Sequence, residues 1–154
     1  MEEWFERTMI GRYTAEREKQ FFMHYLERFA PCGVQTVVRQ GGEWLGSSEN
    51  VVAVPRDVLM TADAMAWESH SIDVLLIPHS HETAALTQVL HEASRVLKPE
   101  GRLVLTGFNP KSLWFFSKWF DGVRLPKKEH CLTLPALKQR LVDLDFEVEF
   151  GKFM

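Results

Sequence analysis

The sequence has little of several features that would assign it to a particular class of protein. It holds only two cysteines, Cys32 and Cys131, with no CxxC pair and no cysteine/histidine ligand spacing. A disulfide framework and a zinc site are therefore not expected, and we expect reduced thiols in a cytoplasmic protein. The formal net charge is only -3, which gives no general attraction to nucleic acid or acidic lipid.

Long apolar runs are also missing. No run approaches the roughly 18 residues that a membrane span requires. The N-terminus, MEEWFERTMIGRY, lacks the basic region and apolar stretch of a secretory signal. We therefore expect neither a membrane nor a nucleic-acid partner. With 154 residues, 45% of them hydrophobic, the chain is predicted to form one domain over residues 1–154, with an N-terminal helical segment over 1–30.

Helical periodicity is clear near the N-terminus. Between residues 14 and 29 the apolar side chains recur at spacings of three and four, with charged residues between them. The apolar stripe consists of Phe21, Phe22, Tyr25, Leu26 and Phe29. This pattern predicts an amphipathic helix that ends before Pro31 and Gly33.

Strand signals follow this helix. A β-branched run over residues 34–38 leads into a loop containing Gly41, Gly42 and Gly46, and NVVAVP forms a second run that ends at Pro55. Residues 59–62 are a weaker candidate for a third strand. The run IDVLLI at 72–77 is nearly all apolar, which is typical of a parallel strand buried on both faces.

The next two elements complete a βαβ unit. An amphipathic helix from Leu86 to Leu97 ends at the sequence KPEG, and RLVLTGF starts another strand. Two strands joined by a helix of this length are parallel. The chain is therefore predicted to be an α/β protein with an open, mostly parallel sheet and helices on both faces, and ligands of such sheets bind beyond the carboxyl ends of the strands.

The C-terminal third is predicted to hold two more helices and a strand. Asn109 and Pro110 look like a helix N-cap and first helical residue, opening the aromatic segment KSLWFFSKWF. A final helix over residues 134–144 leads to FEVEF, whose alternation predicts a strand over 146–150.

One long segment carries a resemblance to a known family. The string SIDVLLIPHSHETAALTQVLHEASRVLKPEGRLVLTGFNPKSLW resembles class I S-adenosylmethionine-dependent methyltransferases. The similarity is to a type-11-like proteobacterial group with the pattern PH…RVL.P.G…GFNP.SLW. The N-terminal WFERTMIGRYTAEREKQ also resembles the opening segment of that group. The resemblance implies a Rossmann-like methyltransferase sheet and S-adenosylmethionine as the cofactor of a methyltransferase whose acceptor the sequence does not identify.

The resemblance also implies a set of site residues. The cofactor would lie across the carboxyl ends of the first and fourth strands of the family sheet. The residues carried over to cofactor binding are Gly41, Gly42, Asp57, Asp63, Ala64, Pro78 and His79. Asn109 and Trp114 are expected to shape the acceptor pocket, although helix capping is the ordinary role of an asparagine at that position.

The first loop departs from the family pattern. The family carries an acidic residue and spaced glycines after its first strand, whereas this chain has Arg39, Gln40 and an adjacent glycine pair. Pro55 lies about where the family places a carboxylate for the ribose, so Asp57 would have to substitute. These departures leave an alternative open, a methyltransferase-like pseudoenzyme that does not bind the cofactor and acts as a dimeric interaction module.

His79 follows the best strand and has two possible roles. It could orient a substrate or take a proton from it, which makes it the candidate catalytic residue, or it could hydrogen-bond within its own loop. A metal site with His81 and Glu82 would lack a third well-placed ligand, so no metal is predicted.

The C-terminal segment suggests that a second copy of this chain is a partner. The family sheet finishes with two C-terminal strands, of which FEVEF resembles the first, and an unpaired sheet edge recruits partners. We therefore expect a homodimer formed through this edge strand or through the aromatic segment 113–120. The aromatic side chains are predicted to pack on the sheet or on the dimer partner rather than on lipid or nucleic acid.

Overall fold

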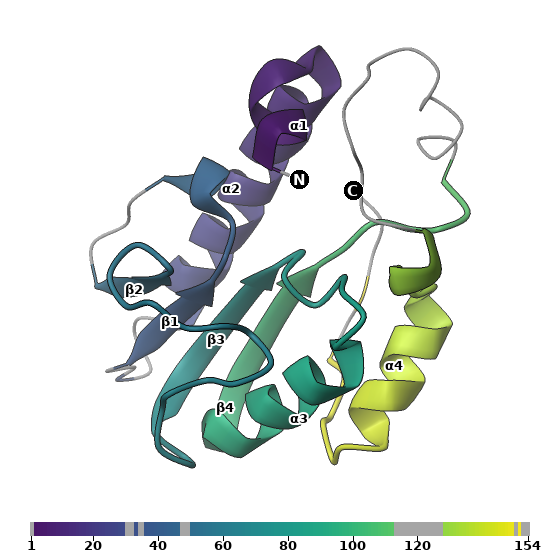
Figure 1. The fold of residues 1–154 in the computed structure, drawn as a ribbon. Helices are drawn as coiled ribbons and strands as arrows, with labels where there is room; N and C mark the ends of the chain where they lie inside the picture. Colours follow the sequence, from purple (N-terminus) through teal and green to yellow (C-terminus); the bar gives the residue numbers. More distant parts are fainter. Residues whose placement is uncertain are drawn as a thin grey trace.

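The computed structural model describes residues 2–29, 33, 36–46, 50–112, 128–149 and 151 (Figure 1). Its helices are α1 (Glu2–Arg7), α2 (Met9–Phe29), α3 (Leu86–Val96) and α4 (Leu134–Val142), with short 3-10 helices η2 (Glu43–Leu45) and η5 (Lys128–His130). Its strands are β1 (Val37–Gln40), β2 (Val51–Val54), β3 (Ile72–Pro78) and β4 (Leu97–Thr106). Helix α2 thus begins at Met9, before residue 14, where the amphipathic helix was predicted to start.

All four strands run parallel in the order β2-β1-β3-β4. β3 lies inside the sheet, and six of its seven residues are buried, as its apolar run predicts. Burying one such aliphatic side chain contributes roughly 1.5–3 kcal/mol, so β3 is a major source of stability. The predicted open parallel α/β sheet is confirmed.

Helices cover both faces of the sheet, as Figure 1 shows. On one face α3 places Val89, Ala93 and Val96 against the strand residues Leu75 and Ile77. On the other face α2 brings its aromatic stripe onto the sheet; Phe22 packs with Val37, Val74, Leu76 and Val104. Alternate residues of each strand therefore face different helices, and the site at the ends of the strands is held by a three-layer core.

Two predicted strands are wrong. Residues 59–62 form only an isolated antiparallel bridge from Thr61 to Ala64, and Leu59 is 88% exposed, so this stretch has no buried face to pair. Residues 146–149 belong to no strand, while Phe150 lies outside the described residues. The Phe146 N–H instead donates to the Leu141 carbonyl at the end of α4.

Other differences concern element boundaries. β1 extends to Arg39 and Gln40, which are buried although the sequence suggested that they begin a loop. Strand β4 starts directly after α3 at Leu97, within the sequence expected to end the helix. Pro110 and Lys111, where the next helix was predicted to begin, form a turn, and the aromatic segment 113–120 lies outside the described residues.

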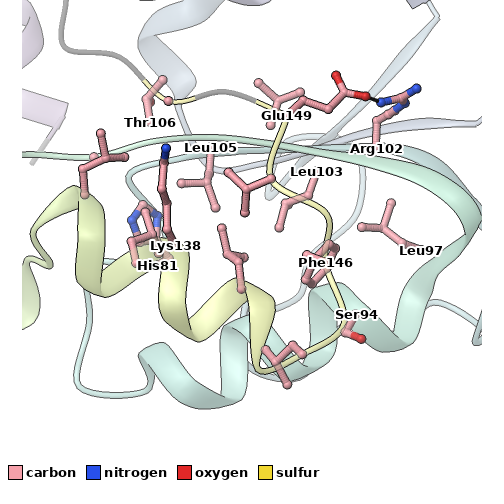
Figure 2. A pocket seen from close by; sticks show the side chains of 18 of the residues that line it. His81, Ser94, Leu97, Arg102, Leu103, Leu105, Thr106, Lys138, Phe146 and Glu149 are labelled. Atoms are coloured by element: carbon pink, nitrogen blue, oxygen red, sulfur yellow. Dashed lines mark ion pairs between the residues drawn. The ribbon is translucent and has the colours of Figure 1, made fainter.

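Strand β4 forms an edge of the sheet. Within the part of the chain that the structure describes, β4 pairs with β3 and no strand pairs with its other side. The segment 146–149 passes near this edge, and Glu149 forms an ion pair with Arg102 of β4 (Figure 2). That contact joins side chains only. It therefore provides no main-chain hydrogen bonds to the outer side of β4 within the described residues.

Candidate functional site

The candidate site lies where the parallel strands end. Gly41, Pro55, His79 and Gly107 each follow directly after a strand, and parallel strands bring such residues to one edge of the sheet. The sequence predicted this edge, and the structure shows which side chains gather there.

A buried network of three side chains forms the centre of the site. His79 Nε2 lies 2.7 Å from Glu18 Oε1 of α2, and His79 Nδ1 lies 2.7 Å from Glu82 Oε2. All three residues are at most 4% exposed. Burial alone would lower the pKa of His79, but the hydrogen bonds and charges of Glu18 and Glu82 outweigh it and raise this pKa to about 9. The ring is therefore an imidazolium at neutral pH, and both nitrogens donate.

The two carboxylates of this network are held by further donors. The Trp44 Nε1–H donates to Glu18 Oε2 at 3.2 Å, and the Phe108 backbone N–H donates to Glu82 Oε1 at 2.5 Å. These bonds satisfy the second oxygen of each carboxylate. Hydrogen bonds of this kind offset the free-energy cost of burying a charged group. The network therefore ties together α2, η2 and the segments after β3 and β4.

Aromatic rings surround His79 and exclude water from it. The centroid of its ring lies 4.3 Å from that of Phe108, 5.3 Å from that of Phe5 and 5.9 Å from that of Trp44. Phe5 and Trp44 also stack on each other, with ring centroids 3.8 Å apart. A cation enclosed by aromatic faces is favourably placed, so the rings support the charged form of His79.

This geometry gives His79 a positioning function. Both nitrogens are already bonded to carboxylates, so in this arrangement neither is available to a substrate proton. Its backbone φ of 59° lies in the left-handed region, which a non-glycine residue adopts only when its surroundings hold it there. The catalytic assignment stays a prediction, while the contacts show that His79 fixes its own loop to α2.

The glycine pair predicted to cradle the cofactor packs against the chain itself. Gly41 and Gly42 have φ values of 84° and 71°. A Cβ on Gly41 would lie 2.0 Å from Ser80 Oγ, and one on Gly42 would lie 2.3 Å from the ring of Pro78. Ser80 Oγ also donates to the Gln40 carbonyl at 2.6 Å. The glycines therefore let the loops after β1 and β3 close on each other.

The two predicted aspartates differ in their surroundings. Asp57 accepts from the Arg56 guanidinium and, at 2.8 Å, from the Ala53 N–H, and these bonds lower the pKa of Asp57 to about 2. Its oxygens are already used to close the turn after β2. Asp63 and its neighbour Ala64 are exposed, and Asp63 makes no side-chain hydrogen bond within the described residues. Asp63 is therefore the carboxylate that a ligand can reach.

The end of β2 carries positive charge where the family places a carboxylate. A cavity of about 290 Å³ is lined by Arg39, Glu43, Gly46, Pro55 and Arg56. Arg39 is 5% exposed and donates from Nη1 to the Gly46 carbonyl at 2.6 Å. Burial and then the nearby Arg56 lower the pKa of Arg39.

On the predicted acceptor side, Asn109 acts within its own turn. Its Oδ1 accepts from the Lys111 N–H at 3.0 Å, and its carbonyl accepts from the Ser112 N–H at 2.9 Å. This is the local bonding of an asparagine that starts a turn or a helix. Trp114, the second predicted acceptor residue, lies outside the described residues.

Sequence reasoning missed Glu18, Trp44 and Phe108. One signal was present for Glu18, because it lies three, four and seven residues before Phe21, Phe22 and Tyr25 on the apolar stripe of α2. A carboxylate on the buried face of a helix requires a partner. The identity of that partner, 61 residues away, could not be read from the pattern.

A larger cavity of about 870 Å³ extends along the open edge of β4 (Figure 2). It is bounded by β4, α2, α4 and the segment 144–149, and its end near the candidate site includes His81, Glu82 and Thr106. Burial lowers the pKa of His81 to about 4, so this imidazole is neutral at neutral pH, unlike His79.

The described residues lack two further features. No group of three or more histidine, cysteine, aspartate or glutamate side chains there is arranged to hold a metal ion. Likewise, none of the helices described is both long enough and apolar enough to span a membrane.

Comparison with solved structures shows a shared fold. A proposed methyltransferase from Bacillus halodurans matches with a TM-score of 0.53 at 18% identity, covering 81% of this chain and 67% of that one. A complex of a methyltransferase activator with a proposed methyltransferase from Haloferax volcanii matches with a TM-score of 0.53 at 12% identity, covering 82% and 56%. The YcgJ protein from Bacillus subtilis matches with a TM-score of 0.45 at 18% identity, covering 62% and 41%.

The chain thus spans between 41% and 67% of the length of these structures. No curated protein matches it. The model of a family described as Methyltransferase domain matches residues 35–105, which include β1, β2, β3, α3 and all but the last residue of β4. Residues 35–105 thus resemble the methyltransferase-domain family, and the chain shares the Rossmann-like fold of these methyltransferase structures.

Proposed function

We propose that this chain carries the core of an S-adenosylmethionine-dependent methyltransferase. The observation that supports the proposal most is the family match over residues 35–105, because it covers β1, β2, β3 and all but the last residue of β4, whose carboxyl ends border the candidate site. When bound, S-adenosylmethionine would supply a methyl group from its sulfonium sulfur. The acceptor depends on a pocket assembled from separate loops.

The described residues fit this cofactor at one end. Asp63 and Ala64, exposed after β2, are free to contact the adenosine part, and the Asp63 carboxylate can accept hydrogen bonds. The glycine pair does not fit as a cradle, because Pro78 and Ser80 fill the space beside it. Arg39 and Arg56 place cationic groups at the end of β2, where the family has a carboxylate.

Alignment of the reactants is the main contribution expected of the protein. Displacement at a methyl group needs orientation more than a proton acceptor, and orientation can supply much of the rate. The Glu18–His79–Glu82 network holds the loop after β3 to α2 with a rigid set of hydrogen bonds. We infer that this network positions the site and takes no proton from the substrate.

A second candidate function is favoured by the closed glycine loop. If Pro78 and Ser80 keep their places beside Gly41 and Gly42, the chain would be a methyltransferase-like pseudoenzyme that acts as a dimeric interaction module. The two functions differ in one measurable property, which is binding of the cofactor.

Isothermal titration calorimetry with S-adenosylmethionine and S-adenosylhomocysteine tests the proposal. We expect micromolar binding of both, weakened at least about tenfold by Asp63→Asn, since a lost hydrogen bond to a charged group costs about 1.5–3 kcal/mol. Glu68→Gln, an exposed carboxylate of the same segment, is the matched control and should bind like the parent chain. Absence of heat at millimolar ligand would instead contradict the methyltransferase proposal and leave the second candidate.

A further inference from the structure

The cavity beside β4 contains polar groups that have no partner in the part of the chain that the structure describes. His81 and Thr106 line it and are 3% and 6% exposed, and His81 Nδ1 and Thr106 Oγ1 make no hydrogen bond within the described residues. A buried polar group without a partner costs about 1–3 kcal/mol, so such groups normally have one. Two of them at one end of a cavity indicate that a ligand supplies the missing bonds.

A cation that has no partner among the described residues lies at the same end. Among the lysine and arginine side chains that line the cavity, Lys98 pairs with Asp73 at 2.9 Å and Arg102 pairs with Glu149. Lys138 of α4 has no ion pair or hydrogen bond in the described part of the chain. Figure 2 shows its side chain rising from α4 toward Thr106, with His81 beside it.

The cavity also has an apolar part between β4 and α4. Its walls include Leu103 and Leu105 of β4, Leu137 and Leu141 of α4, and Phe146. Its volume of about 870 Å³ is within the range of ligand pockets, roughly 300–1,000 Å³. An elongated apolar body would lie along β4 between these side chains.

We propose that this cavity binds an elongated apolar carboxylate, such as a medium-chain fatty acid, with the head group at Lys138, Thr106 and His81. The Lys138 ammonium provides the opposite charge, and the Thr106 hydroxyl and a ring N–H of His81 donate to the carboxylate oxygens. His81 is neutral, so it can donate from one nitrogen without adding a second charge. The inference concerns binding and does not depend on binding of S-adenosylmethionine.

The test is calorimetry with decanoate, using decyltrimethylammonium as a probe with the same chain and the opposite charge. We expect one decanoate per chain and at least tenfold weaker binding of the cation. Lys138→Met should weaken decanoate binding about tenfold to a hundredfold and Thr106→Val about threefold to tenfold. Lys138→Arg should largely restore it, and Lys19→Met, an exposed lysine of α2, should leave it unchanged.

Three results would overturn the proposal. Equal binding of both probes would show unspecific apolar adsorption, and unchanged binding by a folded Lys138→Met variant would show that the head group lies elsewhere. Circular dichroism of each variant verifies that it is folded. No decanoate binding, together with a dimer in light scattering, would show that a strand from a second copy occupies the edge of β4.

Discussion

At the scale of single residues, the Glu18–His79 contact sets the stability of the site. Replacing Glu18 by Gln keeps the shape of the side chain and removes the charge that faces the imidazolium. We expect a loss of about 1.5–3 kcal/mol in the free energy of unfolding, because both partners are fully buried. Urea denaturation measures this change. Glu16→Gln, exposed on the same helix, should change stability by less than about 0.5 kcal/mol, and an equal effect of both variants would contradict the buried ion pair.

The two histidines predict a stability maximum near pH 6.5. The pKa of His79 is raised from 6.5 to about 9, so its contribution is complete below pH 6.5 and is lost as the pH rises through 9. The pKa of His81 is lowered from 6.5 to about 4, so its contribution is complete above pH 6.5 and is lost as the pH falls through 4. Urea unfolding measured from pH 4 to 10 should show the free energy of unfolding falling on both sides of this maximum. The fall toward low pH is the acid limb, and the fall toward high pH is the alkaline limb.

Variants separate these two limbs. His79→Gln should flatten the alkaline limb, which amounts to roughly 3 kcal/mol for a shift of this size, and His81→Asn should flatten the acid limb. An alkaline limb that persists unchanged in His79→Gln would assign it to other groups.

At the scale of elements, the loops after β1 and β3 act as one packed unit. Gly41→Ala would force a Cβ onto Ser80 Oγ at a backbone φ of 84°, so we expect a loss of about 1–3 kcal/mol. Ser80→Ala removes the obstructing oxygen, so the double variant should lose less than the two single variants added together, by about 0.5 kcal/mol or more. Thermal unfolding of the four proteins gives the coupling free energy between the two positions. Strictly additive losses of stability would contradict a contact between the two loops.

The sequence was most informative where an element is held by its own apolar pattern. The run of β3 and the face of α3 that carries Val89 and Ala93 were predicted because burial on a fixed period is a local property. Arg39 was misplaced because a buried arginine depends on a carbonyl supplied from a loop seven residues later. The strand expected over 146–150 failed because alternation can favour a strand without providing the neighbour it must pair with.

The sequence predicted where the candidate site lies better than it predicted which side chains form it. Parallel strands place His79 at the shared edge whatever the neighbouring side chains are. The hydrogen bonds of Glu18, Trp44 and Phe108 depend on tertiary contacts between distant segments, which no spacing in the sequence encodes.

At the scale of the whole molecule, the open edge of β4 bears on oligomeric state. An exposed strand edge offers main-chain donors and acceptors to a second chain, so we propose that the chain without a ligand in the β4 cavity forms a homodimer through β4. The sequence led us to expect a homodimer through the strand 146–150 or the segment 113–120 instead. Light scattering during size-exclusion chromatography should give twice the mass of 17.9 kDa at micromolar concentration. Leu103→Lys, which places a charge on the edge strand, should shift the protein toward monomer, whereas a monomeric parent chain would contradict the dimer.

The bond between Glu18 and His79 also has a consequence for how the molecule opens. It joins α2 to the loop after β3 across 61 positions, so the N-terminal helices can lift from the sheet only after this bond breaks. Local opening is detected as amide hydrogen exchange, and its free energy should include that of the bond. Once corrected for the intrinsic pH dependence of exchange, protection of the α2 amides should therefore fall above pH 9, while protection in β3 should not.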